Sequence, residues 1–514
     1  MKKLILASVV FLLSVMSLSI VYAIEAFNVD TKNGLKTELI YYNKEKAFNG
    51  YTMFHPRLVH PDFANIYLID MEGNVVHTWP GADNPKLMEN GNVLARFTEM
   101  DWDGKQVWRG KANVHHDTWR IYNKKLKAYT TIGLTRESGY TQENVISQGA
   151  DPNRDYSGAY ADGVVEVDMD GNVIWRWTFL DHVIQDKDPN LPNYVGKGKT
   201  IADYPGKLDL NWVTDQSRVN GDGTPGVIKD WQHTNALDYN EELDHIAINA
   251  KHWSEFYVID HGATFVPNDP EKSIELAASD AGDFIYRFGN PSAYQQGDPP
   301  GNKDEGDQQM YGSHGVEWID KGLPGAGNMM LFDNGCYNPR GFKSRIIEIN
   351  PFIAGVDEKT GKPIISDRFV NPPDAGYKAN GESNQVVYRY QSRNLNSFYS
   401  YFASSVQRLP NGNNLVCSAR HGHLFEVTPD GEVVWEYINP GQNSGIKKVI
   451  VDEESNSHSV FRAYRYGPDH PAFRGKDLTP KGKITDLFAA GKLEYKPGAP
   501  GGDKGKKGDK GGKK

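Results

Sequence analysis

The sequence predicts an all-β protein: a six-bladed β-propeller with four-stranded antiparallel blades, long inserted loops and a disordered C-terminal tail. Three observations support this fold class. A pattern of strand, tight glycine turn and strand ending in an aromatic recurs along the chain, a second strand pair precedes most copies, and no long amphipathic helical pattern accompanies them. The 514 residues are 38% hydrophobic and 24% charged, an ordinary globular composition. The net charge of −9, with no basic domain, argues against a nucleic-acid partner.

The chain opens with a predicted export signal in residues 1–23. Two lysines precede a long apolar stretch, and Val21-Tyr22-Ala23 fits a small-x-small cleavage site. We expect the mature protein to begin near Ile24, to be periplasmic or secreted, and to have no stable membrane insertion after cleavage. An uncleaved anchor is the alternative, because the apolar stretch approaches the ~20 residues that span a bilayer.

The remaining chain divides into four predicted parts. These are an N-terminal lead-in segment (24–50), the propeller (51–470), a C-terminal extension (471–497) and a Gly/Lys-rich tail (498–514). The tail has no apolar residue able to anchor it to a core, so we expect it to be disordered.

The outer strand pair of each blade is predicted from six copies of one pattern. The copies span residues 65–79, 100–108, 164–177, 280–288, 358–369 and 424–437. Their turn glycines are Gly73, Gly104, Gly171, Gly282, Gly361 and Gly431. Each glycine supplies the positive φ that a tight hairpin turn requires.

The inner strand pairs are predicted from segments 86–97, 233–252, 314–335 and 404–422. The first blade lacks its innermost strand, and residues 459–466 could supply it and so close the ring. Uneven spacing of the turns places insertions at 134–160, 181–230 and 262–312. Two stacked β-sandwiches are the alternative architecture.

Reactive side chains fall at equivalent positions of the repeats. In a propeller blade, the start of the innermost strand (A) and the loop between the second and third strands (B–C) open on the same face. Strand starts carry His115, His116, His233 and His314. The B–C loops contain Lys251-His252, residues 336–345 and residues 420–423. We expect these groups to face one funnel at the axis.

Histidines beside guanidinium and ammonium groups favour a tetrahedral oxyanion as ligand. Three histidines could instead bind zinc or copper, but Arg340 and Lys251 would repel a divalent cation, so we expect neither metal nor cofactor. In an exported protein Cys336 and Cys417 could form one disulfide, a pairing that the sequence leaves open.

Several stretches resemble the bacterial aryl-sulfate sulfotransferase family. They are YLIDMEGNVVHTW, the HTN at 233–235, LFDNG followed by SRIIEI, and GNNLVCSARHGHLFEVTPDGEVVWEYINP. The likeness covers most of residues 50–470. It implies an exported six-bladed propeller that moves a sulfuryl group from a phenolic sulfate ester to a phenolic acceptor, without the nucleotide donor PAPS. It also implies ping-pong kinetics through a sulfohistidine and is compatible with a homodimer.

The resemblance also implies roles for individual residues. The catalytic set is His421 as nucleophile together with His314, His233 and Arg340. The substrate-binding set is Arg345, Asn235, Lys251 and His423. His423 stays a rival for the nucleophile, because the assignment of His421 depends on counting back five residues from Glu426.

Two other functions fit a propeller of this kind. A quinoprotein-type oxidoreductase also repeats a glycine turn before a tryptophan, but such enzymes typically have eight blades and an adjacent cysteine pair. A non-catalytic propeller that serves as a binding module is the second alternative. The physiological donor and acceptor, the oligomeric state and the role of the tail stay open.

Overall fold

The computed structural model describes most of the chain beyond the predicted export signal. The described residues are 35–57, 64–137, 141–156, 160–213, 230–301, 304–336, 338–392, 398–442, 445–446, 449–450 and 458–493. The predicted signal at 1–23 and the predicted tail at 498–514 lie outside them. Among the described residues, no helix is long and apolar enough to cross a bilayer.

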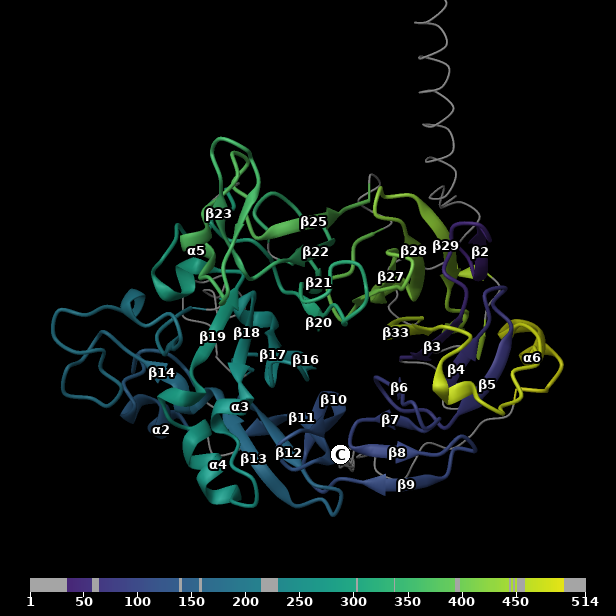
Figure 1. Cartoon of the computed structure of the whole chain (residues 1–514), viewed down its shortest axis with the longest axis horizontal. Helices are drawn as coiled ribbons and strands as arrows, with labels where there is room; N and C mark the ends of the chain where they lie inside the picture. The colour runs from purple at the N-terminus through teal and green to yellow at the C-terminus, as the bar shows by residue number, and fades with distance from the viewer. Residues whose placement is uncertain are drawn as a thin grey trace, which may run out of the picture.

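Six antiparallel sheets form a ring around a central axis, which confirms the predicted six-bladed propeller (Figure 1). The strands of each blade are given from the axis outward. The first blade contains β33 (Val460–Tyr466), β3 (Tyr51–Pro56), β4 (Ile66–Ile69) and β5 (Val75–Trp79), and the second contains β6 (Lys86–Leu87), β7 (Val93–Ala95), β8 (Thr98–Met100) and β9 (Gln106–Arg109). The third contains β10 (Val114–Asn123), β11 (Ala128–Glu137), β12 (Ala161–Val167) and β13 (Val173–Thr178). The fourth blade contains β16 (Thr234–Asn240), β17 (His245–Ala250), β18 (Glu255–Asp260) and β19 (Phe284–Phe288), and the fifth contains β20 (His314–Trp318), β21 (Met329–Asp333), β22 (Arg345–Ile349) and β25 (Val386–Tyr390). The sixth contains β26 (Ser405–Arg408), β27 (Asn414–Ser418), β28 (His423–Val427) and β29 (Val433–Ile438).

The two ends of the chain meet in the first blade and close the ring. As predicted, the segment at 459–466 supplies the missing innermost strand: β33 pairs antiparallel with β3, with Tyr466 opposite Tyr51. Arg465 on β33 reaches the sixth blade, where its guanidinium pairs with Glu426, and its Nε donates to Thr52 Oγ1 at 3.0 Å. The lead-in segment adds β2 (Glu38–Tyr42) to the outer edge of the sixth blade.

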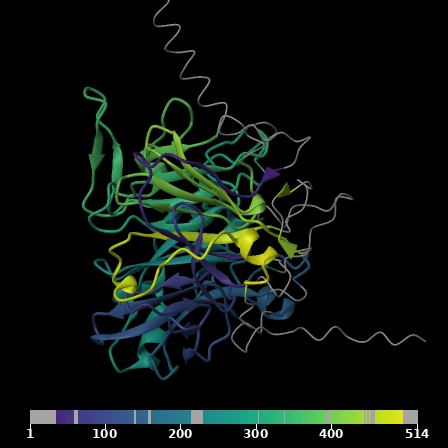
Figure 2. The same ribbon diagram turned by 90° about the vertical axis from the view of Figure 1, so that its right-hand side faces the viewer.

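Two of the six predicted outer pairs are wrong. Residues Asp280–Gly282 form a 3-10 turn, and β19 pairs with β18 across an insertion that contains α3 (His261–Thr264) and α4 (Pro270–Ala277). The copy at 358–369 lies in a separate hairpin, whose strands β23 (Ile353–Val356) and β24 (Pro363–Ile365) project from the left-hand side in Figure 2. A glycine turn is a local signal, and long-range pairing decides which hairpins join a blade.

The remaining elements are short and lie in the connections. The helices are α2 (Gln142–Ser147), α5 (Pro372–Ala375) and α6 (Ile484–Ala489). The strands are β1 (Leu35–Lys36), β14 (Val183–Ile184), β15 (Leu208–Asp209), β30 (Gly441–Gln442), β31 (Gly445–Ile446) and β32 (Val449–Ile450). α2 interrupts the loop between β11 and β12, and β14 and β15 lie in the connection between β13 and β16, where the uneven turn spacing predicts insertions.

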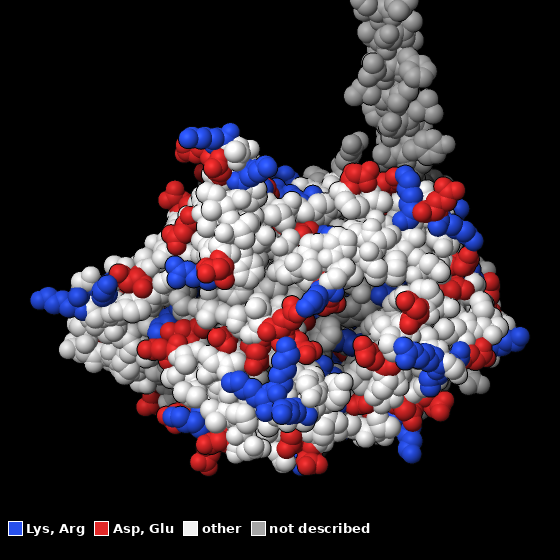
Figure 3. Space-filling model, in the orientation of Figure 1, with Lys and Arg blue, Asp and Glu red and all other residues white. Residues whose placement is uncertain are grey.

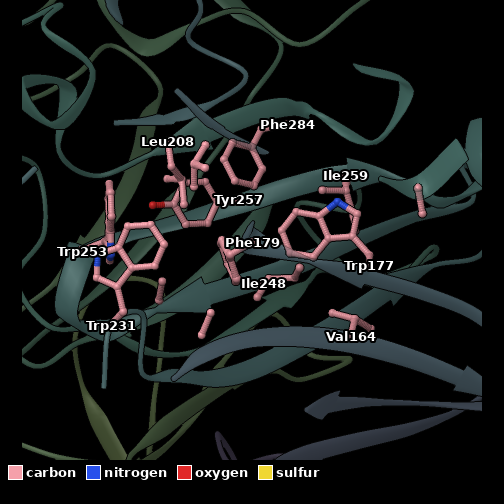
Figure 4. Close-up of a cluster of buried hydrophobic side chains, with 14 of the residues drawn as sticks. Val164, Trp177, Phe179, Leu208, Trp231, Ile248, Trp253, Tyr257, Ile259 and Phe284 are labelled. Carbon is pink, nitrogen blue, oxygen red and sulfur yellow. The ribbon is translucent and has the colours of Figure 1, made fainter. Parts of the chain in front are cut away.

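The largest hydrophobic cluster fills the space between the third and fourth blades (Figure 4). Trp231 and Trp253 pack edge to face there, with ring centroids 5.5 Å apart, and both are buried. Burying a large side chain contributes roughly 1.5–3 kcal/mol. Trp231 precedes strand A of the fourth blade, and Trp253 ends the B–C turn of the same blade. This core therefore fixes two segments that carry histidines.

The two cysteines do not form the disulfide that the sequence left open, because their thiols lie in different places. No disulfide joins Cys336 and Cys417, and both side chains are buried. The Cys336 thiol contacts the Tyr401 carbonyl oxygen at 2.9 Å, whereas the Cys417 thiol lies 3.5 Å from the Val460 carbonyl oxygen. The two cysteines therefore serve as small buried side chains in different places.

Replacing Arg465 by alanine should destabilise the ring at its closure. The change leaves Glu426 buried without its cation, a loss of about 3–5 kcal/mol in the free energy of unfolding. Urea denaturation of the full chain measures it. Lys46→Ala is the matched control, because its pair with Glu432 is exposed and should contribute little. Equal effects of the two changes would contradict the closure role.

Candidate active site

Four histidines from three blades lie close together at the end of the ring where the A strands begin, and two of them lie against Phe461. The ring of His233, just before β16, lies 5.3 Å from that of His116 and 4.6 Å from that of His252. Phe461, on the closing strand β33, lies 5.7 Å from His116 and 6.4 Å from His314. We call His116, His233, His252 and His314 the histidine cluster.

The A strands that carry the cluster share one backbone irregularity. The register shifts after His115 on β10, after Thr234 on β16 and after His314 on β20. His116 and His233 both adopt φ of 50°, a left-handed conformation that costs a non-glycine residue about 1–3 kcal/mol. Equivalent bulges in neighbouring blades therefore turn these side chains out of the ladder.

Asp230 orients two members of the histidine cluster. Its Oδ2 lies 2.5 Å from His233 Nδ1, and its backbone carbonyl oxygen accepts a hydrogen bond from His252 Nδ1 at 2.6 Å. Burial opposes ionisation of Asp230, but the His233 hydrogen bond and the nearby imidazoles hold its pKa below the usual range. Both rings are therefore anchored through Nδ1, which leaves Nε2 as the nitrogen able to act on a ligand.

The other side of the histidine cluster is anchored by a neutral amide. His314 Nδ1 lies 2.7 Å from Asn334 Oδ1, while Asn334 Nδ2 donates to the carbonyl oxygens of Ser400 and Ala403. Those two bonds orient the amide, so His314 Nδ1 is the donor. Burial first, and then the Lys251 charge, place the pKa of His314 well below its usual value.

Burial also keeps the rings of His116 and His252 neutral. It lowers the pKa of His116 well below normal, with His115 as the next cause, and it lowers the pKa of His252 to about 4, with His233 next. Neutral imidazoles in a site surrounded by fixed cations are able to act as nucleophiles or bases near neutral pH.

Fixed cations surround the histidine cluster from three blades. Lys251 acts electrostatically on His314, and Arg136 acts on His116. Arg57 lies over the Phe461 ring, 5.0 Å from its centroid. Such an arrangement favours an anionic ligand with oxygen atoms.

Sequence reasoning missed Arg57, Arg136, Asp230 and Phe461. The rule that B–C loops open on the site face would have found Arg57, which directly follows β3, and Arg136, which lies at the end of β11. Asp230 stands three residues before His233, and only folding shows that its carboxylate turns back onto the imidazole.

Other predicted site residues are not brought into the histidine cluster. Arg340 is half-exposed and pairs with Glu305 at 3.2 Å. The buried Arg345 is held by Asp333, with Nε 2.8 Å from Oδ2. Asn235 is buried too, donating to the Ser313 carbonyl oxygen at 2.9 Å and so joining the fourth blade to the fifth. Through these contacts Arg345 and Asn235 stabilise the ring of blades.

The two candidate nucleophiles have different surroundings. His421 is partly buried in the B–C turn of the sixth blade, and burial, then His458 and Arg420, lower its pKa to about 3. His423 is buried on β28, with Nε2 2.8 Å from Glu436 Oε1. Ala419, in the same turn as His421, packs in one small hydrophobic cluster with Phe461, which connects this turn to the histidine cluster.

Asp230, His233 and His252 could also hold a metal ion, because one ligand atom from each lies within 4.8 Å of the others. In this structure, however, the Asp230 carboxylate is engaged with His233 Nδ1, and the Nδ1 of His252 donates to backbone. The neighbouring Lys251 adds a positive charge. The arrangement therefore fits an anion better than a cation.

A large cavity of about 1290 Å³ lies at the far ends of the A strands, away from the histidine cluster. Its lining contains five basic and six acidic residues, and several of these form ion pairs, as in Lys321 with Glu242 and Arg120 with Glu99. Figure 3 shows acidic and basic side chains intermixed on this face. The cavity therefore lacks the excess positive charge that an anionic substrate requires.

The depressed pKa of His252 should appear as pH-dependent stability. As the pH falls from about 6.5 to 4, the unfolded chain binds a proton at this residue and the folded chain does not, so stability falls. His252→Asn should flatten the slope of unfolding free energy against pH in that window, by up to about one proton per molecule. Urea titrations across the window measure it, and an unchanged slope would contradict the assignment.

Comparisons with solved structures return other proteins at very low identity. A protein of unknown function from Bacteroides caccae is 8% identical with a TM-score of 0.36, covering 81% of this chain and 98% of its own. A glucose dehydrogenase is 12% identical with a TM-score of 0.32, covering 76% and 92%. The periplasmic gluconolactonase PpgL of Pseudomonas aeruginosa is 10% identical with a TM-score of 0.31, covering 78% and 97%. Scores this low carry no argument about function.

No curated protein matches the sequence significantly. The model of the family described as Arylsulfotransferase (ASST), in contrast, matches residues 25–465. That span contains the whole histidine cluster, the cations around it and nearly all of the propeller. The chain therefore belongs to the arylsulfotransferase family.

Proposed function

We propose that this protein is an exported, periplasmic or secreted enzyme that transfers a sulfuryl group from an aryl sulfate to a phenol, without a nucleotide donor, through a sulfohistidine. Family membership supports aryl sulfotransferase activity in general. The observation that carries the proposal is the histidine cluster, in which burial keeps His116, His252 and His314 neutral beside fixed cations.

The cations account for binding of the donor. A sulfate monoester presents three oxygens and one negative charge, which guanidinium and ammonium groups bind by charge-assisted hydrogen bonds. Lys251 and Arg57 come from the B–C positions of the fourth and first blades, and Arg57 lies over the ring of Phe461, an aromatic side chain that could contact an aryl group. Arg340 takes no step in this proposal, because its partners are Asp304 and Glu305.

We assign the nucleophile to His421. Its neutral imidazole would attack sulfur in line, forming an N–S bond while the S–O bond to the leaving phenolate breaks. His423 is the weaker rival, because it is buried in the strand and faces Glu436. An acceptor phenol then loses its proton to a base in the cluster and attacks sulfur, which breaks the N–S bond and restores His421.

Donor turnover tests the proposal directly. The mature protein should release nitrophenolate from 4-nitrophenyl sulfate in a burst, and added phenol should convert the burst to sustained turnover. Acceptor-independent sustained release would indicate a sulfatase, and no release would indicate a binding module.

The position of the sulfuryl adduct tests the nucleophile. Intact-mass analysis after donor addition should show one adduct, absent in His421→Ala and retained in His423→Ala, the matched control from the same segment. Peptide mapping of the adduct to His423, or to a member of the histidine cluster, would overturn the assignment of His421.

Lys251→Met should weaken use of the donor. Loss of one charge-assisted contact of about 1.5–3 kcal/mol predicts a fall in kcat/KM for the donor of about tenfold or more. Lys321→Met, on the face away from the histidine cluster, is the control and should leave kcat/KM unchanged. Similar values for the two variants would remove Lys251 from the substrate-binding set.

A further inference from the structure

We propose that Asp230 is a positioning residue that makes His233, rather than His314, the base that takes the proton of the acceptor phenol. This inference rests on the proposed function and deepens it, because it assigns different roles to two similar histidines. The geometry of their Nδ1 partners carries the argument.

The partner of His233 is a carboxylate. Asp230 Oδ2 accepts the Nδ1 proton at 2.5 Å, so the lone pair of His233 resides on Nε2. When Nε2 takes the phenol proton, the imidazolium that forms is hydrogen-bonded to a full negative charge. An aspartate in this position both holds the tautomer and stabilises the charged ring.

The partner of His314 is an amide. Asn334 Oδ1 holds the same ring nitrogen at 2.7 Å and so fixes the same tautomer, but it contributes no charge. Lys251, His233 and Arg462 all disfavour a proton on His314. Protonation of His314 therefore lacks the compensation that Asp230 provides at His233.

Asp230 is held rigidly enough for this role. It forms an isolated bridge with Tyr160 of the third blade, and its carbonyl oxygen accepts from His252 of the fourth. The buried Trp231 follows it directly and packs on Trp253 (Figure 4). The carboxylate is thus positioned before a substrate binds, as a catalytic pair requires.

The transfer balances without a further reactant. The acceptor O–H bond breaks, its proton moves to His233 Nε2, and the phenol oxygen forms a bond to sulfur. The N–S bond breaks and its electron pair returns to the nucleophilic imidazole. His233 then releases the proton to solvent.

The test separates the two half-reactions in the full chain carrying Asp230→Asn. The donor burst should stay within about threefold of wild type, while transfer to phenol should slow by about 100-fold. With an electron-poor phenol that is already a phenolate at the assay pH, Asp230→Asn and wild type should transfer at similar rates, because no proton has to be removed. A merely structural defect would slow both acceptors equally.

Asp244→Asn is the matched control, since Asp244 Oδ1 lies 2.6 Å from His261 Nδ1 in an Asp–His pair outside the histidine cluster. It should affect neither half-reaction selectively. His233→Gln gives a second variant, which should show the same selective loss with phenol if Asp230→Asn folds poorly. Selective loss in His314→Gln instead would reverse the assignment, whereas a wild-type protein with no donor burst would refute the proposed function itself.

Discussion

The pairing of β33 with β3 is the constraint on which the rest of this structure depends. It joins the C-terminal strand to the N-terminal one, and Arg465 extends the closure to Glu426 in the sixth blade. The same strand places Arg462 on the axis, where it pairs with Asp117 and donates to the Asn235 carbonyl oxygen at 3.0 Å. One strand therefore connects several blades, and its Phe461 lies against two members of the histidine cluster, His116 and His314.

The electrostatic design of the site follows from burial. Imidazoles taken out of water lose protons more easily, and nearby fixed cations strengthen that tendency. Asp230 is the carboxylate that the structure places within hydrogen-bond distance of His233, so a positive charge formed on this ring is stabilised. Similar side chains in one cluster can in this way have different hydrogen-bond partners and different roles.

The two ends of the propeller axis differ in local charge. At the end with the histidine cluster, Lys251 and Arg57 lie near neutral rings. At the other end, acidic residues slightly outnumber basic ones in the cavity lining, and some of them pair, as Lys321 does with Glu242. Net local charge, and not cavity size, distinguishes the end suited to an anionic ligand.

The sequence by itself determined the propeller, its closing strand and the face on which the histidines lie. These follow from strand alternation and from the equivalence of positions in a repeat, both of which are local signals. Only the tertiary structure decided that the hairpin at 358–369 lies outside the blades, that Arg345 is held by Asp333, and that Asp230 turns onto His233. Those outcomes depend on contacts between segments or on side-chain direction after a bulge, which no local pattern encodes.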